Sequence, residues 1–175
     1  MDTKETKDTK VKPLLVPFVF FVAIAFLAYY WWPTPERTIK NRLRGLAEIL
    51  SVPVNDGDLG RVTRVAQLRH YFADDVHVRA GVGGSEITSR DALLGVVGGW
   101  KPPAGGWTIE FVDMQVTVGQ ESTTAQVYLT ATISGHDAQT GEATLDAREA
   151  NLTMSKPGSE WVVTGVESVD TLQRP

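Results

Sequence analysis

The longest uninterrupted apolar segment of the chain, Leu14–Trp32, contains no charged residue. With a helical rise of 1.5 Å per residue, this run covers roughly 28 Å, which is close to the ~30 Å hydrocarbon thickness of a bilayer. The pattern predicts a single transmembrane helix over residues 14–33. A charged tail (1–13) precedes it, and the remaining residues, 34–175, are long enough to bury the core of one domain.

Two groups of side chains suggest what this helix contacts. Four aromatic residues at its end are typical of a bilayer interface: Tyr29, Tyr30, Trp31 and Trp32. Three small residues allow another membrane helix to approach closely and form the expected docking face: Ala23, Ala25 and Ala28. A cleaved signal peptide is the alternative, because residues 23–25 resemble a cleavage site, but this triplet lies inside the run and not after it.

Charge around the apolar run bears on its orientation. Four lysines precede the run and four basic residues follow it closely, so the positive-inside count is tied. The basic residues that follow are also explained as one polar face of a helix. We therefore expect a bacterial inner-membrane protein with a cytoplasmic N-terminus and a periplasmic domain.

The first part of the domain has helical periodicity. A helix is expected to begin at Pro35, after Thr34 as its N-cap, with an apolar stripe at Ile39, Leu43, Leu46, Ala47 and Leu50. A second helix is expected over 59–71, burying Val62, Val65, Ala66 and Leu68 or Phe72. A third, over 91–97, is expected to open at Ser89-Arg90-Asp91. Between the second and third helices we expect a turn at 73–75, a short strand over 76–80 and a flexible glycine-rich hairpin at 81–84.

From Gly105 onward the pattern alternates with a period of two. The apolar parity changes near Phe111, which predicts a β-bulge there. Further strands are expected over 124–133, over 142–155 with a parity change between Ala147 and Ala150, and over 161–169. Three helices followed by a curved antiparallel sheet predict an α+β fold.

Composition narrows the chemistry. The chain has no cysteine, which excludes disulfides, thiolate metal sites and cysteine nucleophiles. Its net charge is −4, and only three of its 21 acidic residues but four of its 17 basic ones lie in the first 13 residues, so the domain is more acidic still. An acidic domain is a poor partner for nucleic acid. Three scattered histidines form no recognisable metal site, and we expect no cofactor.

The segment 72–97, FADDVHVRAGVGGSEITSRDALLGVV, and the order of elements resemble the nuclear-transport-factor-2-like superfamily, which includes SnoaL-like cyclases and ketosteroid isomerases. The resemblance covers residues 35–172 and implies a cone-shaped fold. That superfamily contains enzymes, ligand binders and non-catalytic scaffolds, so the fold alone names no function. Its single-span members include the periplasmic scaffold subunit of type IV secretion systems, which shares only the layout.

The resemblance also implies where a catalytic base would stand. In ketosteroid isomerases the base aspartate follows the second aspartate of the Ala-Asp-Asp turn by five residues, and here that position is Ala80. Proton abstraction needs a carboxylate or an imidazole, so an isomerase of that type is not expected. Glu149 is a weak catalytic candidate, because the expected parity change would turn it toward the cone, although an ion pair or an exposed position explains it equally well. The residues expected to line the cavity are Val76, Val78, Ala80, Trp107, Phe111 and Met114.

Three hypotheses about function follow. The first is a non-catalytic, single-span accessory subunit that docks in a larger membrane protein complex through its helix and its cone-shaped domain. The second is a membrane-anchored SnoaL-like enzyme or small-ligand binder that uses the cone cavity. The third is a self-associating scaffold of the type IV secretion kind. Among partners, a second copy of the chain, forming a homodimer through the sheet, is also considered.

Overall fold

A computed structural model describes residues 20–24, 26, 34–54, 56–79, 86–100, 105–136, 140 and 142–169. The chain divides into two units, Met1–Thr34 and Pro35–Pro175. In the first unit, residues 20–24 and 26 are helical, and the large apolar ones among them are between 49% and 74% exposed. Among the described residues, no helix has the length and apolarity required to cross a bilayer. Most of the predicted transmembrane helix lies outside the described residues and remains a prediction.

The second unit contains three helices. α2 (Pro35–Leu50) begins where expected and buries Ile39, Leu43, Leu46 and Ala47. α3 (Asp58–Leu68) follows it, and α4 (Arg90–Gly99) starts after Ser89, whose hydroxyl accepts a hydrogen bond from the Ala92 amide. That side chain satisfies one of the free amides at the helix start.

The predicted inward face of α3 is confirmed for Val65 and Leu68 and wrong for Val62 and Ala66. Val62 is 64% exposed and Ala66 is exposed, whereas Leu68 is fully buried. The inward stripe is Arg61, Arg64, Val65 and Leu68, which also recurs at helical spacing. Two arginines can occupy this stripe because each is paired with an aspartate near the start of α3.

Six strands form one sheet in the order β2-β1-β6-β5-β4-β3. Their bounds are β1 Phe72–Arg79, β2 Glu86–Ile87, β3 Trp107–Val118, β4 Thr124–His136, β5 Ala143–Ser155 and β6 Val162–Val169. The α+β class is confirmed, but the expected antiparallel sheet is in fact mixed, because β1 and β6 pair in parallel. Hairpins fix alternating directions from β3 to β6, whereas no hairpin connects β1 to β6.

Three local predictions about the strands can be compared with the sheet. The bulge near Phe111 is confirmed two residues further on, where the register shifts between Val112 and Gln115 and Asp113 has a φ of 52°. The turn at 73–75 is wrong, because β1 already begins at Phe72. The parity change between Ala147 and Ala150 is also wrong, because the pairing of β4 with β5 is continuous.

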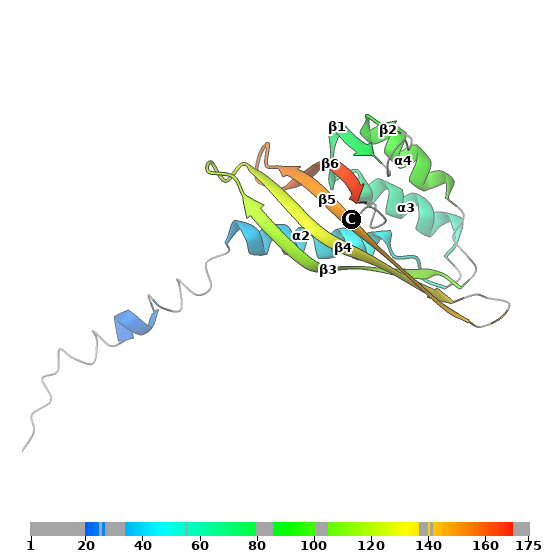
Figure 1. Cartoon of the computed structure of the whole chain (residues 1–175), viewed down its shortest axis with the longest axis horizontal. Helices are drawn as coiled ribbons and strands as arrows, with labels where there is room; N and C mark the ends of the chain where they lie inside the picture. The colour runs from blue at the N-terminus through cyan, green and yellow to red at the C-terminus, as the bar shows by residue number, and fades with distance from the viewer. Residues whose placement is uncertain are drawn as a thin grey trace, which may run out of the picture. The chain divides into compact units, whose positions relative to one another are not determined.

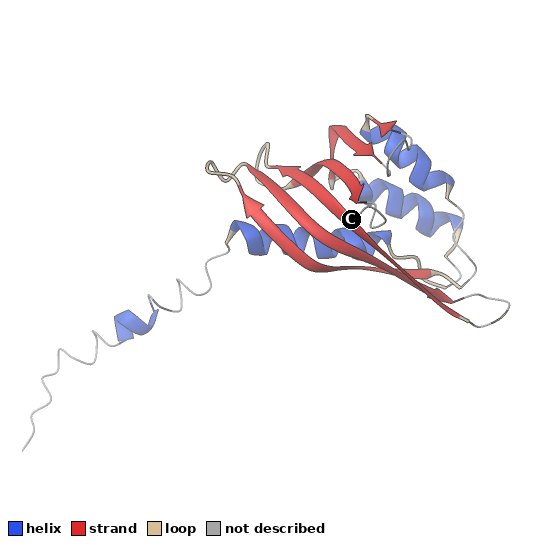
Figure 2. Cartoon of the chain, viewed as in Figure 1, coloured by secondary structure: helices blue, strands red, loops and turns tan. Residues whose placement is uncertain are grey.

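The helices pack on one face of this sheet, and the core lies between them (Figures 1 and 2). β4 contributes alternate residues to that core, as its pattern predicts, with Ala125, Val127 and Leu129 at most 3% exposed. Met154 of β5 is fully buried, and Trp161 is 2% exposed. The other residues below 6% exposure in the same cluster are Ile39, Leu43, Leu46, Leu68, Val76, Leu152 and Val163.

Candidate functional site

The strand in which related isomerases carry their base, β1, contacts α4 through an ion pair. Asp74 of β1 pairs with Arg90 at the start of α4, and Arg90 also donates to the Phe72 carbonyl at 3.3 Å. This contact ties α4 to β1. The position that matches the isomerase base, Ala80, lies outside the described residues.

The side chains expected to line a cavity are packed instead. Val76 is fully buried, and Val78, Phe111 and Met114 lie partly buried against the core. Side chains packed at core density leave no space for a ligand around Val76. Phe111 borders an open groove of about 500 Å³ between α2 and β3, and Trp107 borders a smaller pocket.

That pocket, which we call the mouth pocket, has a volume of only about 30 Å³. It is lined by Leu50, Val52, Arg61, Arg64, Val65, Val97, Trp100, Trp107 and Ile109. The Trp100 and Trp107 rings meet edge to face with centroids 6.0 Å apart. The Trp107 indole donates to the Leu50 carbonyl at 2.8 Å. Ligand pockets usually hold about 300–1,000 Å³, so the mouth pocket has room for about one water molecule.

Backbone hydrogen bonds also connect two residues that line the mouth pocket. Trp107 and Val52 exchange two backbone hydrogen bonds of 2.8 and 2.9 Å. Gly106 has a φ of 67°, and a side chain there would collide with the backbone of Val52 and Pro53. Glycine is required at this position because it both adopts the left-handed region and leaves room for the second backbone.

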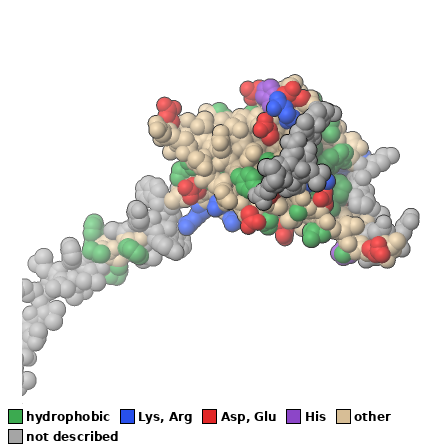
Figure 3. Space-filling model, in the orientation of Figure 1, with side chains coloured by type: hydrophobic (Ala, Val, Ile, Leu, Met, Phe, Trp, Pro, Cys, Tyr) green, Lys and Arg blue, Asp and Glu red, His purple; other side chains and the backbone are tan. Residues whose placement is uncertain are grey.

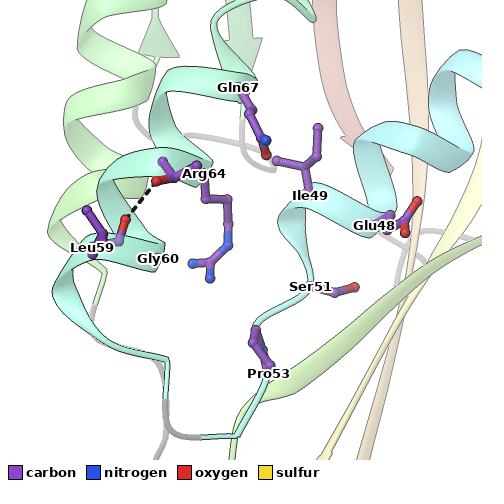
Figure 4. Close-up of a pocket in the computed structure, with 9 residues that line it drawn as sticks. Glu48, Ile49, Ser51, Pro53, Leu59, Gly60, Arg64 and Gln67 are labelled. Carbon is purple, nitrogen blue, oxygen red and sulfur yellow. Dashed lines mark hydrogen bonds between the residues drawn. The ribbon is translucent and has the colours of Figure 1, made fainter.

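A wider groove, with a volume of about 660 Å³, runs between the end of α2 and α3 (Figure 4). Its charged lining residues are Glu48 and Arg64. Arg64 is already paired with Asp56 at 2.7 Å, and the two side chains are 14% and 8% exposed. Because this arginine is held by a buried partner, it supports the loop before α3 and is not free to bind an anion.

Glu149 does not face the interior. It lies opposite Thr130 in the β4–β5 pairing, next to the pair Ala150 and Leu129, which contributes to the core. Adjacent residues of a strand point to opposite faces, so Glu149 lies on the outer face of the sheet. The expectation that it could act in the cone cavity is therefore wrong.

The outer face carries rows of polar side chains across the strands. One row runs from His77 through Gly165, Thr153 and Gln126 to Thr117, as the strand registers show. The next row contains Arg79, Glu167, Asn151, Tyr128 and Gln115. These rows border adjoining grooves of about 380 and 320 Å³.

His77 lies on this outer face with Asp75 and Arg79, as expected for a surface histidine. Arg79 pairs with Glu167 at 3.3 Å and with Glu86 at 3.4 Å. Figure 3 shows a histidine among acidic and basic side chains over β1 and β2. All three charged groups are about half exposed or more, so these pairs contribute little to stability.

The first unit contributes little to a site in the part of the chain that is described. Ala23 is helical and exposed, whereas Ala25 and Ala28 lie outside the described residues. So do the four aromatic residues of the expected interface: Tyr29, Tyr30, Trp31 and Trp32. Throughout the described ranges, no three histidine, aspartate or glutamate side chains gather as metal ligands.

Comparison with known proteins establishes the fold. No protein-family model matches the chain, and no curated protein matches it by sequence. A nuclear-transport-factor-2-like protein with a cystatin-like fold from Novosphingobium aromaticivorans matches with a TM-score of 0.63 and 12% identity, covering 95% of this chain and 94% of that one. A candidate scytalone dehydratase from the same organism matches with a TM-score of 0.57 and 15% identity, covering 77% and 83%.

A candidate calcium/calmodulin dependent protein kinase II association domain from Xanthomonas campestris is also similar, with a TM-score of 0.51 and 12% identity over 63% of this chain and 76% of that one. The names of these neighbours describe an enzyme and an association domain. At such low identities the likeness shows a shared fold alone. The chain thus has a nuclear-transport-factor-2-like, cystatin-like fold, and its function must be argued from its own residues.

Proposed function

We propose that this chain is a non-catalytic accessory subunit of a larger bacterial membrane protein complex. Residues 14–33 anchor it in the inner membrane, and the cone-shaped domain docks on the complex in the periplasm. The observation that carries the proposal is the filled interior: Val76 is buried in the core, Val78, Phe111 and Met114 pack against it, and the mouth pocket beside Trp107 holds about 30 Å³. Because the described residues fill this part of the interior, we look for the functional surfaces on the outside of the domain.

The first unit supports the membrane part of the proposal. Phe20, Phe21 and Phe26 are each at least 68% exposed on a helical segment within an apolar run. Lipid or another membrane helix is the environment in which such side chains are favourable. Ala23 leaves a gap in this apolar surface that a second helix can fill.

Purification of the full chain in mild detergent tests the proposal. We expect integral membrane proteins to co-purify in fixed stoichiometry, identified by mass spectrometry. Ala23→Phe should reduce their recovery severalfold, whereas Ile24→Phe, which replaces one large exposed residue with another, should not. Recovery of the wild-type chain free of other proteins would overturn the accessory role.

The expected orientation can be tested with the same cysteine-free chain. Glu121→Cys introduces a single thiol in the exposed turn between β3 and β4. A membrane-impermeant maleimide should label it in intact spheroplasts without lysis. Labelling only after lysis would place the domain in the cytoplasm.

Self-association is a second candidate role, and a specific observation favours it. One part of the sheet, Ala143–Arg148, is exposed along its whole length. The neighbour described as an association domain has the same fold, so self-association has a precedent within this fold. Native mass spectrometry of the purified chain tests this role, because a scaffold forms homo-oligomers in the absence of other subunits and a monomer would contradict it.

A further inference from the structure

Among the described residues, one part of β5 is paired along only one edge. β4 pairs with β5 from Ala143 to Ser155, but β6 pairs only with Glu149–Ser155. In the part of the chain that is described, no strand lies along the other edge of Ala143–Arg148. Backbone amides and carbonyls at such an edge are available to another strand.

This segment is also uncovered on both faces. All six residues from Ala143 to Arg148 are exposed, and Leu145 is 76% exposed. Figure 1 shows that the ribbon of β4 and β5 continues beyond the end of α2. The helices do not cover this segment, so packing against them does not account for its apolar side chains.

The two faces of the segment have different chemistry. Ala143, Leu145 and Ala147 share the outer face of the sheet, and Thr144, Asp146 and Arg148 share the other. Arg148 and Asp146 form an exposed ion pair of 3.1 Å. Glu142, the preceding residue, lies at the same parity as these charged residues.

We propose that this edge binds the same edge of a second copy of the chain, in an antiparallel pairing around a two-fold axis at Leu145. Leu145 then lies opposite the partner's Leu145, and Ala143 lies opposite the partner's Ala147. On the other face, Glu142 lies opposite the partner's Arg148. The two sheets join into one continuous sheet, and the exposed leucines cover each other.

The sequence is complementary to itself in this register. The apolar row Ala-Leu-Ala reads the same in both directions, and the acidic and basic ends of the segment exchange places under the two-fold axis. Moving the axis to Asp146 would set that residue against the partner's Asp146, and like charges directly opposite are unfavourable. The register centred on Leu145 also uses only residues that β6 leaves free.

This inference is independent of docking in a membrane complex. A chain that dimerises by this edge could still bind other subunits through its helix, and a chain without other subunits could still dimerise. Cross-linking measures the first property and co-purification the second. Failure of one therefore leaves the other unchanged.

The absence of cysteine allows a direct test in the full-length, detergent-solubilised chain. Leu145→Cys places one thiol on the axis, and mild oxidation should convert most of the protein to a disulfide-linked dimer. Ser134→Cys is the matched control, because Ser134 lies beside Leu145 on β4. In the proposed dimer the two control thiols are separated by three strand spacings, about 14 Å, and cannot form a disulfide.

Charge reversal tests the register without a cross-link. Glu142→Arg or Arg148→Glu alone should weaken dimerisation at least tenfold in sedimentation experiments, and the two together should restore it. Equal cross-linking of the two cysteine variants would overturn the proposal. It would also fail if the edge were found to pair with the chain's own residues 170–175 or with a different protein.

Discussion

The two parts of β5 belong to one strand and pair continuously with β4, but their surroundings differ. From Glu149 to Ser155 the strand lies between β4 and β6, and its alternate residues Leu152 and Met154 are buried. From Ala143 to Arg148 it has one neighbouring strand among the described residues, and every residue is exposed. Backbone pairing with β4 is common to both parts, so coverage by β6 and the helices makes the difference. The covered part, Glu149–Ser155, therefore stabilises the domain, and the uncovered part, Ala143–Arg148, is exposed to a binding partner.

The largest expected effect comes from the covered part. Met154→Ala removes a side chain that is fully buried, so it should lower the free energy of unfolding by about 3 kcal/mol. Leu145→Ala in the uncovered part should change it by less than about 0.5 kcal/mol under conditions where the chain is monomeric. Urea unfolding of both variants measures the contrast, and equal losses would show that the outer part is covered.

Ion pairs sharpen the same contrast at a smaller magnitude. Asp56→Ala leaves Arg64, which is 14% exposed, without its partner and should destabilise the domain by about 2 kcal/mol. Asp146→Ala breaks the exposed pair with Arg148 and should cost less than about 0.5 kcal/mol. Denaturation midpoints of the two variants, compared with wild type, measure the difference. A larger loss for Asp146→Ala would mean that its pair is buried in the protein as it exists in solution.

Hydrogen exchange should show the smallest change that still separates the two parts. Amides of Ala143–Arg148 should exchange faster than those of Glu149–Ser155 in the monomer, because one edge of the segment is open to water. Raising the protein concentration should slow the exchange of amides in Ala143–Arg148 and leave the exchange of those in Glu149–Ser155 unchanged. Slow exchange in both segments at the lowest concentration would contradict an open edge.

The sequence predicted the elements that carry strong periodicity. α2 begins after Thr34, β4 alternates from Ala125 to Leu129, and the parity change in β3 marks a real bulge. These elements could be predicted because burial of one face requires apolar residues at a fixed spacing along the chain. The α+β class followed from them.

Other features could not be read from pattern. α3 exposes Val62 and turns Arg64 inward, because a buried arginine is tolerated when Asp56 pairs with it, and that partner comes from the loop before the helix. The parallel pairing of β1 with β6 joins segments far apart in the chain. The sequence placed Glu149 on the wrong face of the sheet, because the small residues around it do not show which positions are buried. Its pairing with β4 shows that it lies on the outer face.

The bulge at Asp113 makes β3 unequally sensitive to changes in length. Before it, Trp107, Ile109 and Phe111 face the helices, and after it Met114, Val116 and Val118 do. Deletion of Asp113 would remove the extra residue and leave all six facing the same way. Deletion of Thr108 or Thr117 would instead move the side chains at one end of the strand to the opposite face of the sheet. Asp113 is therefore the position in β3 where the chain can lose a residue and keep its faces in order, giving up only the bend.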